Sequence, residues 1–203
     1  MRNRLRRASL ARGDAGLTLV ELLVAMVILS VVTAVSYSIL ITVSKQSRDI
    51  SGRQETVTQL RNAVEQMDRQ IRSGNVLYDP ANETTLTNGL PNSMRVYTQT
   101  NGLEKCVQWQ LLSGTLRSRS WSTTWQTDGQ VSPWGTVARG ITNTTSPFTL
   151  DNSTAFGSRL INISFTARDS TAGGTDQTVQ TSLSGRNTEY GYDTGVCSPL
   201  PAP

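Results

Sequence analysis

The sequence predicts an α+β protein in which one long N-terminal α-helix packs on an antiparallel β-sheet. Three observations lead to this fold class. Residues 17–44 form a largely apolar segment with a single charged residue, and residues 57–71 carry an apolar stripe at helical spacing. Residues 93–187 contain short runs of alternating apolar and polar residues separated by turn residues. A chain of 203 residues has room for a membrane segment and one modest domain.

The apolar segment is long enough to cross a membrane. At a rise of about 1.5 Å per residue, residues 17–44 make roughly 42 Å of helix, which exceeds a hydrocarbon core of about 30 Å. Five arginines precede the segment within residues 1–16, and three basic residues follow it at Lys45, Arg48 and Arg53. This bias favours an N-terminus in the cytoplasm and a C-terminal domain outside it.

The charge and composition exclude several classes of function. The formal net charge is +4, but residues 17–203 contain equal numbers of basic and acidic side chains, so the basicity belongs to the leader. Nucleic-acid binding is therefore not indicated. The chain has no histidine, the commonest general base and zinc ligand, and it shows no constellation of nucleophile and base. We expect no catalytic residues, no metal and no cofactor.

Glu21 is the single charge in the apolar segment. A carboxylate at the centre of a membrane helix costs roughly 2.5–3.5 kcal/mol, and somewhat less near an end. A secretory signal peptide cut after Ala34-Val-Ser36 is one reading, and a simple signal anchor is another. The apolar run, however, continues to Val43, and neither reading accounts for Glu21.

The stretch GLTLVELL at residues 16–23 resembles the processing site of type IV prepilins and of the pseudopilins of type II secretion. In that family a short basic leader ends in glycine, and an apolar residue, usually phenylalanine, follows. Thr-Leu-Ile/Val and a glutamate at the fifth mature position come next. Gly16, Leu17 and Glu21 match these positions. The departures are leucine in place of phenylalanine and the lack of a proline in residues 17–44, which leans toward a minor pilin or pseudopilin.

The resemblance implies a particular maturation and a role for the carboxylate. The family's prepilin peptidase, an intramembrane aspartyl enzyme, would cut after Gly16 and often methylates the freed amine, here that of Leu17. Glu21 would then pair with that amine in its own chain or in a neighbouring subunit. A buried charge is tolerated when paired, so the pair would set the register between subunits. The alternative is that Glu21 extends toward the cytoplasmic headgroups.

The helix is expected to continue beyond the membrane. An apolar stripe at spacings of three and four is formed by Val57, Leu60, Val64, Met67 and Ile71. Packing of this stripe on a sheet is favoured over a coiled coil, because it spans only about two heptads. Ser73-Gly74-Asn75 is the expected stop, with glycine in the left-handed conformation. The prediction is one helix over residues 17–73, with Gly52 as a possible kink.

The exported domain is expected to be rich in antiparallel strands. Residues 106–111 alternate as a half-buried strand, and a hairpin around residues 112–115 leads into a second strand over 116–121. Residues 125–134 are rich in turn formers, and residues 161–167 form the clearest strand. A turn at residues 172–175 then leads to a last strand over 179–183.

The two cysteines, Cys106 and Cys197, are best read as one disulfide in a domain outside the cytoplasm, with two unpaired buried thiols as the alternative. Many pilins have a C-terminal disulfide loop, but the interval of 91 residues here is longer than is typical. Three tryptophans could line a ligand-facing patch or complete a small core, namely Trp121, Trp125 and Trp134.

The resemblance and the residues together predict a structural minor pilin of a type IV pilus-like filament. Its expected partners are the prepilin peptidase, other pilin or pseudopilin subunits, the inner-membrane assembly platform, and membrane lipid before assembly. The precursor would cross the cytoplasmic membrane once, and the assembled subunit would lie in a cell-surface filament. Alternatives are a pseudopilin of a type II secretion or competence DNA-uptake system and a membrane-anchored binding domain that never polymerises.

The expected organisation has five parts. These are a basic leader that is removed (1–16), a transmembrane and assembly helix (17–44), an amphipathic helical extension (45–75), a β-rich exported domain (76–198) and a flexible tail (199–203).

Overall fold

The computed structural model describes residues 16–83, 91–153, 157–168, 176–185 and 192–202. The leader up to residue 15 and the turn expected at residues 172–175 lie outside this part of the chain. The chain divides into two compact units, residues 1–47 and 48–203. The first contains the apolar part of the long helix, and the second contains the rest of that helix together with the strands.

The helix α1 extends over Leu19–Arg72, close to the predicted range of 17–73, and it continues through Gly52. Its last turn carries Arg72, whose Nε lies 2.7 Å from the Oδ2 of Asp68, one turn earlier. The basic side chains at this end also complement the helix dipole. The amphipathic extension predicted over 45–75 is therefore helical as far as Arg72, and its last two residues begin strand β1 (Gly74–Leu77).

Gly74 follows the helix for a different reason from the one expected. It is not among the glycines with positive φ, so the prediction of a left-handed cap at this position is wrong. A Cβ on Gly74 would lie 2.8 Å from Cγ2 of Val96 and 2.9 Å from the carbonyl oxygen of Ile71. Glycine is required here because the chain enters the sheet directly against a neighbouring strand.

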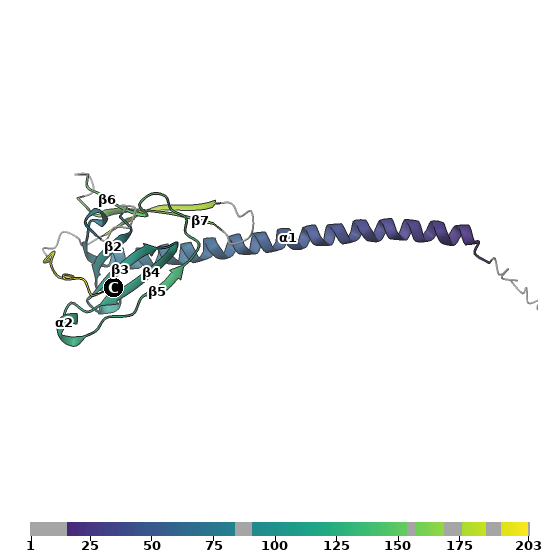
Figure 1. Ribbon diagram of the computed structural model, residues 1–203. Coiled ribbons are helices and arrows are strands. Elements are labelled where there is room, and N and C mark those ends of the chain that lie inside the picture. The colour runs from purple at the N-terminus through teal and green to yellow at the C-terminus, as the bar shows by residue number, and fades with distance from the viewer. Residues whose placement is uncertain (1–15, 84–90, 154–156, 169–175, 186–191, 203) are drawn as a thin grey trace, which may run out of the picture. The chain divides into compact units, whose positions relative to one another are not determined.

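The larger sheet has five antiparallel strands in the order β1-β2-β3-β4-β5. Figure 1 shows β2 to β5 lying side by side. The predicted hairpin joins β3 and β4 through Ser113 and Gly114, which both have positive φ, as a tight two-residue turn requires. The strands are β1 (Gly74–Leu77), β2 (Ser93–Thr98), β3 (Lys105–Leu112), β4 (Thr115–Trp121) and β5 (Gly135–Ala138).

A second sheet of three antiparallel strands has the order β6-β7-β8, where the sequence led us to expect a single sheet. Its strands are β6 (Phe148–Asp151), β7 (Leu160–Arg168) and β8 (Asp176–Ser184). An isolated bridge between Ile141 and Ala167 joins it to the chain that leaves β5. Three short helical elements complete the domain, namely η1 (Pro80–Asn82), η2 (Thr100–Gly102) and α2 (Trp125–Asp128).

The main core lies between α1 and the inner faces of the two sheets. The predicted helical stripe supplies Leu60, Met67 and Ile71, each with no exposed surface, while Val64 packs at the margin. The indole Nε1 of Trp109 on β3 donates to Oε1 of Gln70 on α1 at 2.7 Å, which satisfies a buried donor inside this core. The layout is α+β and pilin-like, with one long N-terminal helix packed on antiparallel strands.

The strand β3 is buried on both faces, so the prediction of a half-buried strand is wrong. The alternation itself is present, because Val107, Trp109 and Leu111 belong to the core shared with α1. The polar residues between them are covered on the outer face of the sheet, where Gln108 is 1% exposed. What covers that face is the C-terminal segment described below.

Candidate processing and assembly site, and the covered outer face of the sheet

The first part of α1 exposes a continuous apolar surface. Of the twenty-two exposed large hydrophobic side chains among the described residues, eighteen fall between Leu17 and Val43. The helix contains a window with mean hydropathy 2.5, long and apolar enough to cross a membrane. A surface of this kind on a soluble monomer would be unfavourable, so the segment requires lipid or other apolar helices around it.

Most of the hydroxyl side chains within this segment find their hydrogen-bond acceptors in the same helix. Five hydroxyl groups donate to carbonyl oxygens three or four residues earlier in the same helix, at 2.7–2.9 Å. The donors are Ser30, Thr33, Ser36, Ser38 and Thr42. Hydrocarbon offers no hydrogen-bond partners, so internal bonding of this kind makes hydroxyl groups compatible with a bilayer.

Gly16 lies just before the helix and is exposed. A Cβ at this position would meet nothing within 4 Å, and its φ is outside the left-handed region. Neither close packing nor backbone conformation in this chain therefore requires glycine at residue 16. Any requirement for a small residue at position 16 would have to come from another molecule that binds the chain there.

Glu21 closes a capping box at the start of α1. Its Oε2 accepts hydrogen bonds from the Thr18 amide at 3.0 Å and from the Thr18 hydroxyl at 2.9 Å. The Glu21 amide in turn donates to the Thr18 hydroxyl at 3.3 Å. Thr18 is a residue that the sequence prediction missed, although the Thr-x-x-Glu spacing before an apolar run is the signature of this cap. The roles of Gly16, Leu17 and Glu21 in processing and assembly stay predictions.

The second candidate region is the outer face of the larger sheet, which begins at a disulfide. Cys106 on β3 is bonded to Cys197, with 5.7 Å between their Cα atoms, and this confirms the predicted pairing. Both cysteines are buried in a small cluster with Val76, Tyr97 and Trp121. The bond thus fixes the C-terminal segment against the face of the sheet opposite α1.

The strand register places polar residues in rows across this face. The alignment of β2, β3 and β4 puts Arg95, Gln108 and Arg119 in one row. Arg119 Nε donates to Gln108 Oε1 at 3.0 Å, and all three residues are at least nine-tenths buried. Charged groups are seldom buried without partners, so this row must be satisfied by whatever lies on top of it.

The C-terminal segment supplies those partners. Arg95 Nη1 donates to the Cys197 carbonyl at 2.9 Å. Arg119 donates from Nη2 to the Pro201 carbonyl at 2.9 Å and from Nη1 to the Ala202 carbonyl at 2.6 Å. The sequence predicts a flexible tail over 199–203, but residues 199–202 are held on the sheet and Pro201 is buried. Residue 203 lies outside the described part of the chain.

A buried ion pair supports one end of this face. Arg95 Nη2 lies 2.8 Å from Glu83 Oε1, and their side chains are 11% and 2% exposed. Burial raises the pKa of Glu83 above its ordinary value, while the positive charge and hydrogen bonds of Arg95 act in the opposite direction. The guanidinium also stacks 3.9 Å from the ring centroid of Tyr78, whose hydroxyl accepts from the Cys197 amide at 3.2 Å.

The three tryptophans complete this covered face rather than forming an exposed patch. Trp121 is 2% exposed within the disulfide cluster, and Trp125 packs against the same cluster. Trp134 lies under the guanidinium groups of Arg117 and Arg119, at 4.2 and 4.5 Å from its ring centroid. Burial, and then the neighbouring charge of Arg117, lower the pKa of Arg119. Trp121 and Trp125 therefore belong to a small core, whereas Trp134 lies partly exposed beneath the two arginines.

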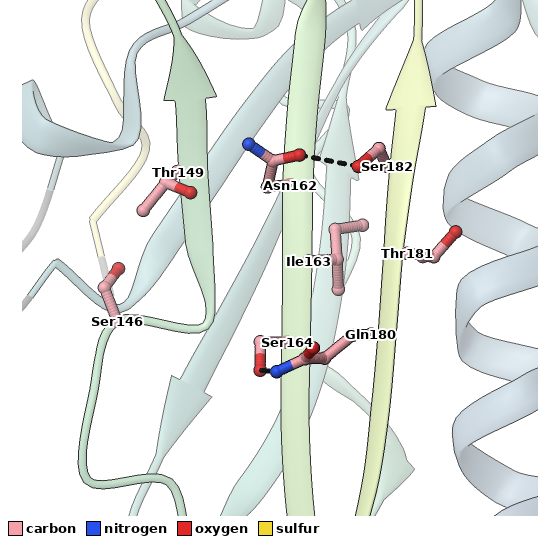
Figure 2. Close-up of a pocket in the computed structure, with 8 residues that line it drawn as sticks. All are labelled: Ser146, Thr149, Asn162, Ile163, Ser164, Gln180, Thr181 and Ser182. Carbon is pink, nitrogen blue, oxygen red and sulfur yellow. Dashed lines mark hydrogen bonds between the residues drawn. The ribbon is translucent and has the colours of Figure 1, made fainter.

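A separate groove of about 380 Å³ lies on the smaller sheet, lined by uncharged hydroxyl and amide side chains together with Ile163. Figure 2 shows these side chains along β6, β7 and β8. Several of them bond to one another across the strands, for example Ser182 to Asn162 at 2.6 Å and Gln180 to Ser164 at 3.3 Å. The groove is therefore a solvated polar face whose groups are largely engaged with each other. Among the described residues no cluster of acidic or cysteine side chains could hold a metal ion.

The apolar helix and the α+β domain together define a membrane-anchored protein of pilin-like layout. Residues 11–37 match the family model described as the prokaryotic N-terminal methylation motif. This match includes Gly16, Leu17 and Glu21, and it supports a protein of the type IV pilin or pseudopilin type. The motif implies processing by a prepilin peptidase and assembly with other pilins. No curated protein and no solved structure matches the chain significantly.

Proposed function

We propose that this protein is a structural minor subunit of a type IV pilus-like filament, cut after Gly16 and assembled through the N-terminal half of α1. The observation that carries the proposal is the methylation motif over residues 11–37, placed at the start of a helix whose apolar surface is exposed from Leu17 to Val43. The subunit would work by association and not by catalysis.

Cleavage after Gly16 would give Leu17 a free amine one helical turn from the Glu21 carboxylate. Within the described part of the chain, both Thr18 hydrogen bonds fall on Oε2 of Glu21, so Oε1 faces no competing donor. The capping box would hold the carboxylate at the helix start while Oε1 accepts an amine. If that amine belongs to a neighbouring subunit, the ion pair penalises any register that leaves either charge unpaired in an apolar bundle.

The start of the mature chain tests the proposal most directly. We expect N-terminal sequencing or intact mass of the protein from membranes to give a first residue at Leu17, carrying a methyl group on its amine. A mature chain that begins near Tyr37 would instead indicate a secretory signal peptide, and an intact Met1 would indicate an uncut anchor. Either result would contradict the proposal.

The role of Glu21 is tested by Glu21→Ala, which should be cleaved like the natural sequence but excluded from filaments. Glu55→Ala is a matched control, because Glu55 is an exposed glutamate of the same helix whose Oε1 accepts from Gln59. Incorporation of Glu21→Ala at the control level would refute the charge-pairing account. If the natural chain is cleaved but does not enter filaments, the alternative of a membrane-anchored domain that never polymerises would be favoured.

The motif is shared by pseudopilins, so a pseudopilus of a secretion or DNA-uptake system remains the second candidate. The two are separated by which assembly platform recovers the protein in cross-linking from membranes, and by whether it occurs in surface-sheared fibres. We place the N-terminus in the cytoplasm and the β-rich domain outside, because the disulfide requires an oxidising compartment.

A further inference from the structure

The outer face of the larger sheet binds the C-terminal segment that covers it, residues 199–202, through contacts typical of peptide recognition. Three hydrogen bonds hold residues 199–202 beyond the disulfide, and all three run from side chains of the sheet region to main-chain carbonyl oxygens. Two come from Arg119 to Pro201 and Ala202. The third comes from the indole Nε1 of Trp125, which donates to the Pro199 carbonyl at 3.2 Å.

Prolines suit such contacts, because a proline has no amide hydrogen and its carbonyl is its only main-chain hydrogen-bonding group. Domains that recognise proline-rich peptides use the same chemistry, an aromatic surface with donors aimed at carbonyl oxygens. The segment Ser-Pro-Leu-Pro-Ala-Pro at residues 198–203 has prolines at alternate positions. The segment that covers the sheet thus has the composition of a proline-rich peptide ligand and not that of a β-strand.

Only one side chain of the segment packs as an anchor beside the prolines. Leu200 contacts the cluster that contains Trp121, Tyr97 and the disulfide. Arg119 also has contacts that do not involve the segment, since it bonds Gln108 and lies against Trp134. Recognition of the segment thus depends on carbonyl spacing and one apolar side chain.

We propose that this face, formed by β2, β3, β4 and α2, is a binding site for an extended proline-containing segment. In the isolated chain the site is filled by residues 199–202, and it accepts the same segment from a second copy. The acceptors of all three hydrogen bonds follow Cys197 in the chain, and a second copy carries a segment of identical chemistry. Exchange would link copies that a shared membrane brings close together. The proposal does not depend on cleavage after Gly16 or on filament formation.

The covalent link between the segment and its own domain determines which segment occupies the site in solution. A segment joined to its site by a short linker acts at an effective concentration in the millimolar range. The chain's own segment should therefore exclude free peptide, and the site should open once that segment is removed or displaced. This defines two variants of the full chain, one that ends at Ser198 and one with Leu200→Asp.

The experiment titrates a synthetic Ser-Pro-Leu-Pro-Ala-Pro peptide into the oxidised, detergent-solubilised chain and follows tryptophan fluorescence and the Trp125 indole NH signal. We expect saturable binding to both opened variants and at least about tenfold weaker binding to the intact chain. Adding Arg119→Gln should weaken binding about tenfold or more, because two charge-assisted bonds are lost. Arg117→Gln is the matched control, since Arg117 lies on the same strand and over the same ring but bonds Gln110.

Binding that is lost with Arg119→Gln and kept with Arg117→Gln supports the proposal. Lack of binding to both opened variants at several millimolar peptide, with the disulfide and near-ultraviolet circular dichroism intact, would overturn it. Equal binding to the intact chain would also overturn it, because the site is filled there. If both opened variants fail to fold, the segment is an integral part of the core and the proposal is likewise wrong.

Discussion

Replacing Glu83 with glutamine will leave the buried guanidinium of Arg95 without its anionic partner while keeping the shape of the side chain. The two side chains are 2% and 11% exposed, and their closest approach is 2.8 Å. Removal of one partner of a buried ion pair costs about 3–5 kcal/mol in general. Arg95 retains the Cys197 carbonyl and the ring of Tyr78, so we expect Glu83→Gln to cost less, about 1–3 kcal/mol.

Arg95→Met should cost more, about 3–5 kcal/mol, because it leaves the carboxylate of Glu83 buried and alone. The double variant should be at least about 1.5 kcal/mol more stable than the sum of the two single effects, since neither charge is then left unpaired. The assay is denaturant unfolding of the oxidised chain in detergent at neutral pH. Asp68→Asn is the control, because its pair with Arg72 is more exposed, at 28% and 55%, and should change stability by less than about 0.5 kcal/mol.

The same pair predicts a pH dependence. Burial raises the pKa of Glu83 in the folded chain above the ordinary value of 4.5. The folded state then holds this proton more tightly than the unfolded state, so the contribution of Glu83 to stability is full below pH 4.5 and declines as the pH rises through the folded pKa. Glu83→Gln should remove this decline. Additive single effects, or an unchanged pH profile, would refute the account of a coupled buried pair.

Three further perturbations have defined outcomes. Thr18→Ala should remove the hydroxyl of the capping box and reduce filament incorporation without preventing cleavage after Gly16, whereas Thr18→Ser should restore incorporation. Reduction of the Cys106–Cys197 bond, which encloses a separation of 91 residues, should lower the free energy of unfolding by about 4–5 kcal/mol in the chain-entropy description, measured by denaturant unfolding with and without reductant. Leu60→Ala should cost about 2–5 kcal/mol in the same assay, because it opens a cavity between α1 and the sheets where Leu60 has no exposed surface.

The N-terminal half of this protein could be anticipated from sequence because its determinants are local. Helical periodicity and an apolar run place α1 within two residues of its observed bounds, alternation locates β3 and β7, and the turn residues of the hairpin locate β4. The glycine, apolar residue and glutamate at 16, 17 and 21 form a linear motif that needs no tertiary contact to be read. Thr18 was readable as well, since its hydroxyl and Glu21 stand at the spacing of a capping box.

The covered outer face could not be anticipated in the same way. The residues Arg117 and Arg119 look like a solvated strand face, and a terminal run of prolines looks like a free tail. Whether a polar side chain is buried depends on what lies on it, and here the cover comes from about eighty residues further along the chain, through Pro201 and Ala202. Non-local contacts of this kind leave no period in the sequence around either partner.

The sequence by itself determined the apolar segment, the long helix and the alternating strands, because each follows from local periodicity, and it favoured the pairing of Cys106 with Cys197 from a count of two cysteines. The tertiary structure alone decided that the strands divide into two sheets, that Gly74 is required by contact with Val96, and that the C-terminal segment covers the arginines of β2 and β4. Strand pairing and burial are properties of surfaces brought together from distant parts of the chain, and only the folded molecule specifies them.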